Sequence, residues 1–417
     1  MSGARIKAAA ALVVALCAPL WASQPGASRP AIQAGAAILM DAQTGTVLFE
    51  KASHQRRAVA STTKIMTALL ALEAGGLDQP VTMSRSAAQV SGSSLHLREG
   101  ETVRMDDLLT ALLLGSANDA AVAIAEHMAG SVEAFADEMN ARARELGARD
   151  THFVNPHGLH EPDHYSSAYD LALITRAAME YPRFRELVQA KTAEIGLYGG
   201  AEGRRSIANH NKLLWRSQFV DGVKTGYVKE SGPCLVASAT RDSWQLIAVL
   251  LDSPEAYEEA LCLLDYGFST YRRRAYARDG DALGRVRVRG SIRRTVPAVC
   301  EETLAAVAGP GLADDAPRLE VTLKDLRAPV ARGDVVGEAR LVARGRVLAR
   351  SPLVAGEPAA RSMLIIISVW AARVLVFLLL MVLLARTYAK AVKAHRCRGA
   401  GVSPEGGGPD PRRPGPG

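Results

Sequence analysis

The sequence predicts an α+β domain, then a small all-β sandwich domain, and then a membrane-spanning helix near the C-terminus. Apolar residues recur at helical spacing through residues 61–147, whereas residues 36–50 and 221–251 hold short apolar runs separated by turns, as strands do. Residues 284–353 alternate apolar with charged residues between frequent Gly and Pro turns, which predicts strands with one solvated face. A long, almost uncharged run follows at 363–385.

Length and composition restrict the possible functions. A chain of 417 residues has room for two or three domains. The formal net charge of +7 comes mainly from arginines, many of which lie in the C-terminal third. Aromatic residues make up only 5% of the chain, and no run of Lys and Arg is interleaved with them. We therefore expect no nucleic-acid partner.

The N-terminus has the pattern of a secretory signal peptide, which we expect at residues 1–27. Arg5 and Lys7 precede an apolar run from Ala8 to about Leu20, and small residues follow. The apolar run is short for a membrane span, which needs about 20 residues. The mature chain is therefore expected outside the cytoplasm.

Residues 363–385 predict a single membrane-spanning helix. A central Arg373 costs about 2.5–3.5 kcal/mol, but each of the many Leu, Ile, Val and Phe residues contributes about −0.3 to −0.6 kcal/mol, so insertion is favoured. Several Arg and Lys residues follow the run from Arg386 onward, whereas Arg361 stands alone before it. By the positive-inside rule, the C-terminus is expected in the cytoplasm.

Composition changes divide the chain further. At Tyr271–Arg274 the pattern shifts from apolar helix to arginine-rich strands, which suggests a domain junction. The expected parts are a signal peptide (1–27), an α+β domain (30–272), a β-sandwich domain (278–358), a transmembrane helix (363–385) and a basic, then Gly/Pro-rich, disordered tail (386–417).

Neither cysteines nor histidines form a recognisable metal pattern. Outside the signal peptide the cysteines are Cys234, Cys262, Cys300 and Cys397, which lack zinc spacing and disulfide-scaffold density. We expect Cys234, Cys262 and Cys300 to be separate buried thiols, with one disulfide as the alternative. Four histidines fall within residues 152–164, among Pro and Gly residues. Hydrogen bonding that stiffens this loop is favoured over a metal site, and no cofactor is expected.

Ser61 and Lys64 are candidates for covalent chemistry. Their spacing places both side chains on one face of a helix, which continues with apolar residues from Ile65 and stops at Gly75. A serine hydroxyl needs a base to become a nucleophile, and a lysine amine can be that base when burial and a nearby positive charge keep it neutral. The same spacing also arises by chance, in which case Ser61 caps the helix and Lys64 is solvated.

Two further short motifs complete a constellation. Ser116-Ala117-Asn118 lies between two expected helices and Lys224-Thr225-Gly226 lies on an expected strand. Ser116 can pass a proton to a leaving amine, and Asn118 can hold both Lys64 and a substrate amide. Lys224 and Thr225 can bind a carboxylate, and Gly226 permits close approach of substrate backbone. Each motif alone is weak evidence, but all three in this order are specific.

These motifs resemble the low-molecular-mass penicillin-binding proteins, which are D-alanyl-D-alanine carboxypeptidases of the serine peptidase S11 type. The resemblance runs from about residue 30 to 360 and includes the stretches Asn155–Leu159, His164–Asp170 and Asp221–Tyr227. It implies the β-lactamase/DD-peptidase fold, in which helices flank an antiparallel sheet, followed by that family's β-sandwich domain and a membrane anchor.

The resemblance also implies an activity: removal of the terminal D-alanine from peptidoglycan stem pentapeptides, with β-lactam antibiotics as covalent inhibitors. Carried over, Ser61 is the nucleophile, Lys64 the base and Ser116 the third catalytic residue. The substrate-binding residues are Asn118, Lys224, Thr225, Gly226 and Tyr227, and the backbone N–H groups of Ser61 and Tyr227 form the oxyanion hole. The enzyme is expected at the cell membrane, facing outward.

Two departures from the family pattern are Ala117, where glycine is common, and Val228, where threonine is expected. The loss of a threonine hydroxyl affects fine specificity more than activity. A β-lactamase and a penicillin sensor without turnover are the alternative functions. The E-x-x-L-N pattern of class A β-lactamases is absent between the second and third motifs, and we expect no cytosolic domain after the membrane span.

Overall fold

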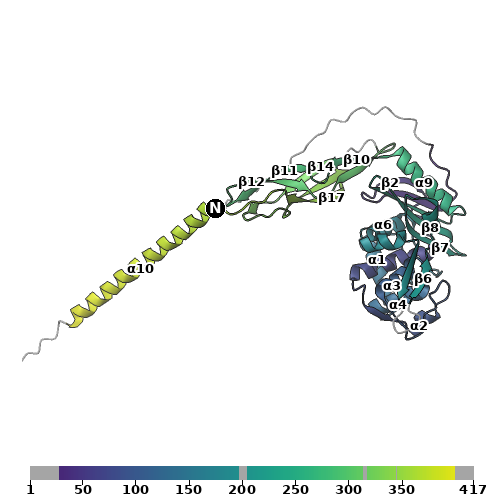
Figure 1. Cartoon of the computed structure of the whole chain (residues 1–417), viewed down its shortest axis with the longest axis horizontal. Helices are drawn as coiled ribbons and strands as arrows, with labels where there is room; N and C mark the ends of the chain where they lie inside the picture. The colour runs from purple at the N-terminus through teal and green to yellow at the C-terminus, as the bar shows by residue number, and fades with distance from the viewer. Residues whose placement is uncertain (1–27, 197–203, 313–316, 344, 400–417) are drawn as a thin grey trace, which may run out of the picture. The chain divides into compact units, whose positions relative to one another are not determined.

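The computed structural model describes residues 28–196, 204–312, 317–343 and 345–399 (Figure 1). The expected signal peptide and the end of the expected tail lie outside these residues. The chain forms two compact units. The first comprises Met1–Asp281, Cys300–Thr322 and Glu338–Pro352, and the second comprises Ala282–Val299, Leu323–Gly337 and Leu353–Gly417.

A five-stranded antiparallel sheet is the centre of the first unit, in the order β2-β1-β9-β8-β7. Its strands are β1 (Ala36–Asp41), β2 (Val47–Lys51), β7 (Val220–Val228), β8 (Gly232–Arg241) and β9 (Trp244–Leu251). The strands predicted within residues 36–50 and 221–251 are confirmed and form the hairpins β1–β2 and β8–β9, which are joined by the pairing of β1 with β9.

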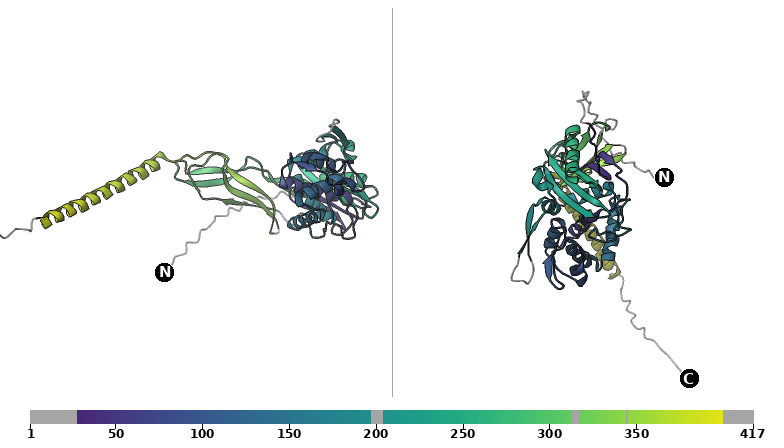
Figure 2. Two further views of the ribbon diagram at one scale, coloured as in Figure 1. Left: turned by 90° about the horizontal axis from the view of Figure 1, so that it is seen from below. Right: turned by 90° about the vertical axis from the view of Figure 1, so that its right-hand side faces the viewer.

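Helices lie on both faces of this sheet (Figure 2). They are η1 (Ala60–Thr63), α1 (Lys64–Ala74), α2 (Arg85–Gln89), α3 (Met105–Leu113), α4 (Asn118–Ala129), α5 (Val132–Glu145), α6 (Ala168–Met179), α7 (Pro182–Gln189), α8 (Leu213–Arg216) and α9 (Ala256–Thr270). Successive residues of a strand point to opposite faces, so Ile38 and Met40 belong to the core on the side of α6, whereas Leu39 belongs to the core on the side of α9. The predicted α+β class is confirmed.

Two small hairpins complete the first unit. They are β3 (Pro80–Thr82) with β4 (Thr102–Arg104), and β5 (Thr192–Gly196) with β6 (Arg204–Ala208). Helix α1 ends as predicted at Gly75, whose φ of 73° is strained for other residues.

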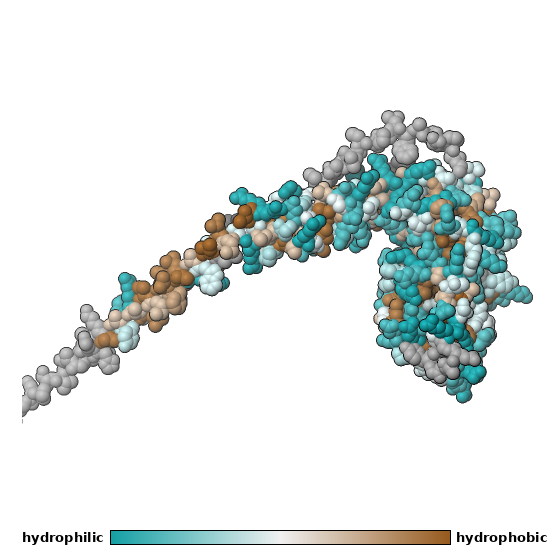
Figure 3. Space-filling view, viewed as in Figure 1, coloured by the Kyte–Doolittle hydropathy of each residue, from teal (hydrophilic) through white to brown (hydrophobic). Residues whose placement is uncertain are grey.

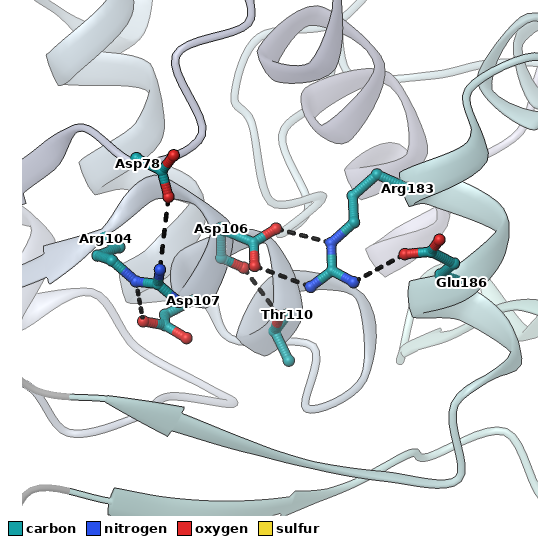
Figure 4. Close-up of polar contacts among 7 residues, drawn as sticks. All are labelled: Asp78, Arg104, Asp106, Asp107, Thr110, Arg183 and Glu186. Atoms are coloured by element: carbon teal, nitrogen blue, oxygen red, sulfur yellow. Dashed lines mark hydrogen bonds and ion pairs between the residues drawn. The ribbon is translucent and has the colours of Figure 1, made fainter.

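Ion pairs fix the start of α3 (Figure 4). Arg183 of α7 donates from Nε and a terminal nitrogen to the two carboxylate oxygens of Asp106, both at 2.8 Å. Arg104 donates from Nε to Asp107 at 3.0 Å. Both carboxylates lie in the first turn of α3, where the helix dipole also favours negative charge. The anchored helix then leads into the loop that carries Ser116.

The C-terminal part of the chain is β-rich, as predicted. A six-stranded sheet has the order β14-β16-β17-β12-β11-β15, and β10 pairs with β13. The strands are β10 (Arg272–Ala277), β11 (Ala282–Arg289), β12 (Thr295–Cys300), β13 (Leu304–Ala308), β14 (Arg318–Leu323), β15 (Leu326–Arg327), β16 (Val335–Ala343) and β17 (Arg346–Ala355). Three of the four residues at the expected domain junction, Arg272 to Arg274, lie in strand β10.

Helix α10 (Met363–Gly399) begins where the sequence predicts a membrane span. Residues Ile367–Val392 are long and apolar enough to cross a bilayer, and their side chains are exposed along the helix (Figure 3). The helix continues past residue 385 through the basic stretch, so the first part of the expected tail is helical.

The prediction of three buried thiols is wrong for one cysteine. Cys234, Cys262 and Cys300 are all free thiols, and Cys234 and Cys300 are buried, but Cys262 is exposed. The buried face of α9 is formed by Ala260, Leu263 and Gly267, and Cys262 lies outside that stripe.

Candidate active site

Lys64 is the centre of a hydrogen-bonded group at the start of α1. Its side chain is 0% exposed, and Nζ donates to Ser61 Oγ at 3.0 Å and to Asn118 Oδ1 at 2.7 Å. A third bond, at 2.8 Å, goes to the backbone carbonyl of His157. Ser61 lies in η1, one turn before Lys64, as the spacing predicts. The two candidate catalytic residues are therefore in direct contact.

The surroundings of Lys64 favour a neutral amine. Burial lowers the pKa of Lys64 well below its ordinary value of 10.5, and the positive charge of Lys224 lowers this pKa further. Asp119 acts in the opposite direction. The Asp119 carboxylate accepts hydrogen bonds from the Ser94 hydroxyl and the Leu95 N–H, at 2.7 and 3.1 Å. The Asp119 carboxylate therefore bonds to this loop and not to Lys64.

Asn118 orients Lys64 through both ends of its amide. While Oδ1 accepts from Lys64, Nδ2 donates to the backbone carbonyl of Ser91 at 2.7 Å, and the backbone N–H donates to Ser93 at 2.7 Å. These partners place the amide oxygen toward the lysine. Asn118 is therefore held from two sides at the first turn of α4.

Ser116 lies in the loop between α3 and α4. Its side chain is buried, and its φ of 59° is unusual for a residue other than glycine. Within the described part of the chain its hydroxyl makes no hydrogen bond. Such strain is typical of functional sites.

The loop at Asn155–Leu159 belongs to this site, although its predicted role was only to stiffen the loop by hydrogen bonds and not to contact Lys64. Asn155 Oδ1 accepts from Gly158 N–H at 2.7 Å, and Asn155 Nδ2 donates to the Leu159 carbonyl at 2.9 Å. A Cβ on Gly158 would lie 1.9 Å from the Ala60 carbonyl oxygen, so only glycine fits here. The folded loop presents the His157 carbonyl to Lys64, and Gly158 was the signal that could have revealed it.

His164 fixes the other side of this loop. Its Nδ1 accepts from the Val154 N–H at 3.1 Å, which leaves Nε2 protonated to donate to Thr63 Oγ1 at 2.8 Å. Burial lowers the pKa of His164 to about 4, so the ring stays neutral at ordinary pH. The predicted hydrogen-bonding role of a histidine in this loop is confirmed. Among the described residues, no group of three His, Cys, Asp or Glu side chains is placed to hold a metal.

Strand β7, at the edge of the sheet, lies against η1 on the side of Ser61. Lys224 is 1% exposed, and burial lowers its pKa to about 7. A Cβ on Gly226 would lie 2.9 Å from the backbone nitrogen of Ser61, so this glycine lets the strand approach η1. That close approach is to the protein's own backbone, whereas the predicted one was to substrate backbone. Tyr227, 69% exposed, lies one residue further along the strand.

The structure thus joins the three motifs to different degrees. Ser61, Lys64 and Asn118 share hydrogen bonds, and Lys224 acts on Lys64 through its charge. Gly226 packs against Ser61. Ser116, Thr225 and Tyr227 belong to the same loop or strand as these residues, but the described contacts do not join their side chains to the hydrogen-bonded group.

Two family models and several known proteins match the sequence of this chain. The family model "D-alanyl-D-alanine carboxypeptidase" matches residues 23–255, and the model "Penicillin-binding protein 5, C-terminal domain" matches residues 271–360. D-alanyl-D-alanine carboxypeptidase DacF of Bacillus subtilis is 34% identical over 348 residues, which cover 81% of this chain and 89% of the relative. DacD of Escherichia coli K12 is also 34% identical, over 79% of this chain and 87% of the relative.

Solved structures agree with these matches. Penicillin-binding protein 5 from Haemophilus influenzae has a TM-score of 0.59 and 30% identity, covering 81% of this chain and 100% of its own. A peptidoglycan synthesis regulatory factor, PBP3, from Streptococcus pneumoniae has a TM-score of 0.65 and 27% identity, over 79% of this chain and 100% of its own. The chain therefore belongs to the D-alanyl-D-alanine carboxypeptidase family.

Proposed function

We propose that the chain is a serine-type D-Ala-D-Ala carboxypeptidase that removes the terminal D-alanine from peptidoglycan stem pentapeptides through an acyl-enzyme on Ser61. The contact between Lys64 Nζ and Ser61 Oγ, with the low pKa of that buried lysine, is the observation that carries the proposal. Relatives named D-alanyl-D-alanine carboxypeptidases support the choice of substrate.

Acylation begins with proton transfer from Ser61 Oγ to neutral Lys64. The oxygen attacks the carbonyl carbon of the penultimate D-alanine, and the backbone N–H groups of Ser61 and Tyr227 stabilise the developing oxyanion. Asn118 and the His157 carbonyl hold Lys64 in line with Ser61 during this step. The substrate contributes the carbonyl, and the chain contributes nucleophile, base and oxyanion donors.

Departure of D-alanine requires a proton on its amine. Ser116, whose hydroxyl is free of protein hydrogen bonds in the described structure, gives its proton to the amine and takes the proton that Lys64 received from Ser61, so that both residues return to their neutral forms. Lys224 and Thr225 bind the terminal carboxylate, which favours the charged form of a lysine whose pKa burial has lowered to about 7. Water then attacks the ester, which releases the shortened peptide and restores Ser61. β-Lactams acylate the same oxygen and act as covalent inhibitors.

The activity is tested by release of D-alanine from a peptide ending in D-Ala-D-Ala, with a matched peptide ending in L-Ala-L-Ala as control. We expect free alanine, measured irrespective of its configuration, from the first peptide only. Acylation by penicillin without D-alanine release would make the chain a sensor. Rapid penicillin hydrolysis without D-alanine release would make it a β-lactamase.

We further propose that α10 spans the membrane once, with its C-terminus in the cytoplasm and the catalytic unit on the opposite side. The candidate span Ile367–Val392 supports a true crossing, and Arg386 onward supplies the basic flank. The penicillin-binding protein 5 domain match immediately before it supports a membrane-associated location.

Deleting everything after Ala360 is expected to give a soluble enzyme with full activity. The hydrogen-bonded group around Lys64 lies wholly in the first unit, so α10 governs location alone. Fractionation and the D-alanine assay, run beside the full chain, measure both properties. A folded but inactive fragment would show that α10 contributes to catalysis.

A further inference from the structure

A cavity of about 550 Å³ lies in the second unit, beside the start of α10. Arg289 and Arg327 from the strands and Arg361 from the connecting segment line one side of it. Trp370 and Arg373 of α10 line the other. Its volume is within the range of small-ligand sites, and four arginines make it strongly cationic.

The helix is tied to the strands that form this cavity. Ser362, the residue before α10, donates its N–H to the Gly290 carbonyl at 2.9 Å. Arg361 forms a bridge with Ser291 and donates from Nε to the Ala328 carbonyl at 3.0 Å. The first turns of α10 therefore follow directly from a backbone pairing, which keeps both walls of the cavity together.

The positive charge of the cavity is largely uncompensated. Arg289 donates to Asp325 at 3.4 Å, but both side chains are mostly exposed, so this pair is weak. No carboxylate within the described ranges pairs with Arg327 or Arg373. An anion that enters the cavity can thus bond to several guanidinium groups, whose fork geometry suits a phosphate.

The position of Arg373 indicates where that anion comes from. Arg373 lies six residues after Ile367, the start of the candidate span, which is about 9 Å along the helix. Side chains of a helix tilt toward its N-terminus, so Arg373 extends back toward the headgroup level instead of remaining in the hydrocarbon. Trp370, which favours the membrane interface, is on the same face.

We propose that this cavity binds the headgroup phosphate of an anionic phospholipid from the leaflet on the catalytic side of the membrane. The proposal rests on the membrane span proposed above. The arginines bond to the phosphate, and Val369 with Trp370 provides an apolar wall for the adjoining acyl chain. A lipid source is favoured over free phosphate because the cavity opens beside the apolar helix. The charge of Arg373, costly within the bilayer, is then neutralised by the ligand.

Native mass spectrometry of the full chain in neutral detergent tests this binding, with short-chain phosphatidylglycerol, short-chain phosphatidylcholine and inorganic phosphate as probes. We expect saturable binding of phosphatidylglycerol at least tenfold tighter than that of phosphatidylcholine. The double variant Arg327→Gln/Arg373→Gln is expected to bind it about 25-fold more weakly, at about fivefold per arginine. The matched control Arg287→Gln/Arg332→Gln removes two exposed arginines of the same unit that do not line the cavity. This control is expected to stay within twofold of the wild type.

Equal binding of the two lipids, an equal loss in the control variant, or displacement of lipid by millimolar inorganic phosphate would each overturn the proposal. D-Alanine release by both double variants is expected to match that of the wild type, so failure of the lipid site is distinct from failure of the enzyme. Extraction of the wild-type chain from membranes by alkaline carbonate would overturn the span itself, and the lipid site with it. Retention without lipid preference would overturn the lipid site alone.

Discussion

Ser61→Ala is expected to abolish covalent labelling by penicillin and to lower D-alanine release by several orders of magnitude, on the order of 10⁶-fold as for other removed serine nucleophiles. The substitution deletes one partly exposed oxygen, and Lys64 keeps its bonds to Asn118 and to the His157 carbonyl. The fold should therefore remain. Gel detection of a fluorescent penicillin, the D-alanine assay and thermal unfolding measure the three properties on one preparation.

Ser269→Ala is the matched control for this experiment. Ser269 is exposed on α9, and among the described residues its hydroxyl donates only to the Tyr266 carbonyl, at 3.2 Å. The control should label and turn over as the wild type does. Labelling of the Ser61→Ala chain at another residue would remove Ser61 as the nucleophile, whereas an unfolded variant would be recognised by its lost thermal transition.

Much of the fold could be predicted because local patterns and tertiary packing agree. The strands β8 and β9 are apolar runs separated by a turn at Asp242, and the cap of α5 at Ser131 accepts the Ala134 N–H as its sequence suggests. The pairing of β1 with β9 was harder to predict from the sequence. These strands are separated by most of the first unit, and no local pattern specifies which edges meet.

The contacts of the candidate site also fall into two groups, those that the sequence predicts and those that depend on tertiary packing. The contact between Ser61 and Lys64 follows from helical spacing, so the sequence was sufficient. The contribution of the His157 carbonyl was harder to predict, because every residue has a carbonyl and Gly158, whose turn directs this one to Lys64, was the one sequence signal for it. Cys262 was predicted to be buried but is exposed, because it lies on an apolar helix outside the face that packs on the core.

Lys64→Arg is expected to lower the acylation rate by about 10²–10⁴-fold, the usual range for loss of a general base. Arginine keeps a positive charge but does not yield a neutral base near neutral pH. If Lys64 served only to balance charge, the arginine variant would retain substantial acylation. The rate of penicillin acylation under single-turnover conditions separates these outcomes, and thermal unfolding checks that the larger side chain is accommodated.

The pH profile gives an independent test of the same role. Burial and the charge of Lys224 lower the pKa of Lys64, so its protonated fraction should decline well below pH 10.5. Only the neutral amine accepts the Ser61 proton, so wild-type acylation should rise with pH through that lowered pKa and then level off. The Lys64→Arg variant should lack this rising limb.

The Lys224→Ala variant is the third chain to compare in the pH experiment. Lys224 affects the Lys64 pKa through its charge. Loss of the Lys224 charge removes a cause that lowers the Lys64 pKa, so the rising limb should move to higher pH. Desolvation is the larger cause and remains, so the limb should stay below the pKa of a free lysine. Loss of carboxylate binding lowers the absolute rate at every pH, and the position of the limb is therefore the quantity to compare. An active arginine variant with the wild-type profile, or a limb unmoved by Lys224→Ala, would place the base elsewhere than Lys64.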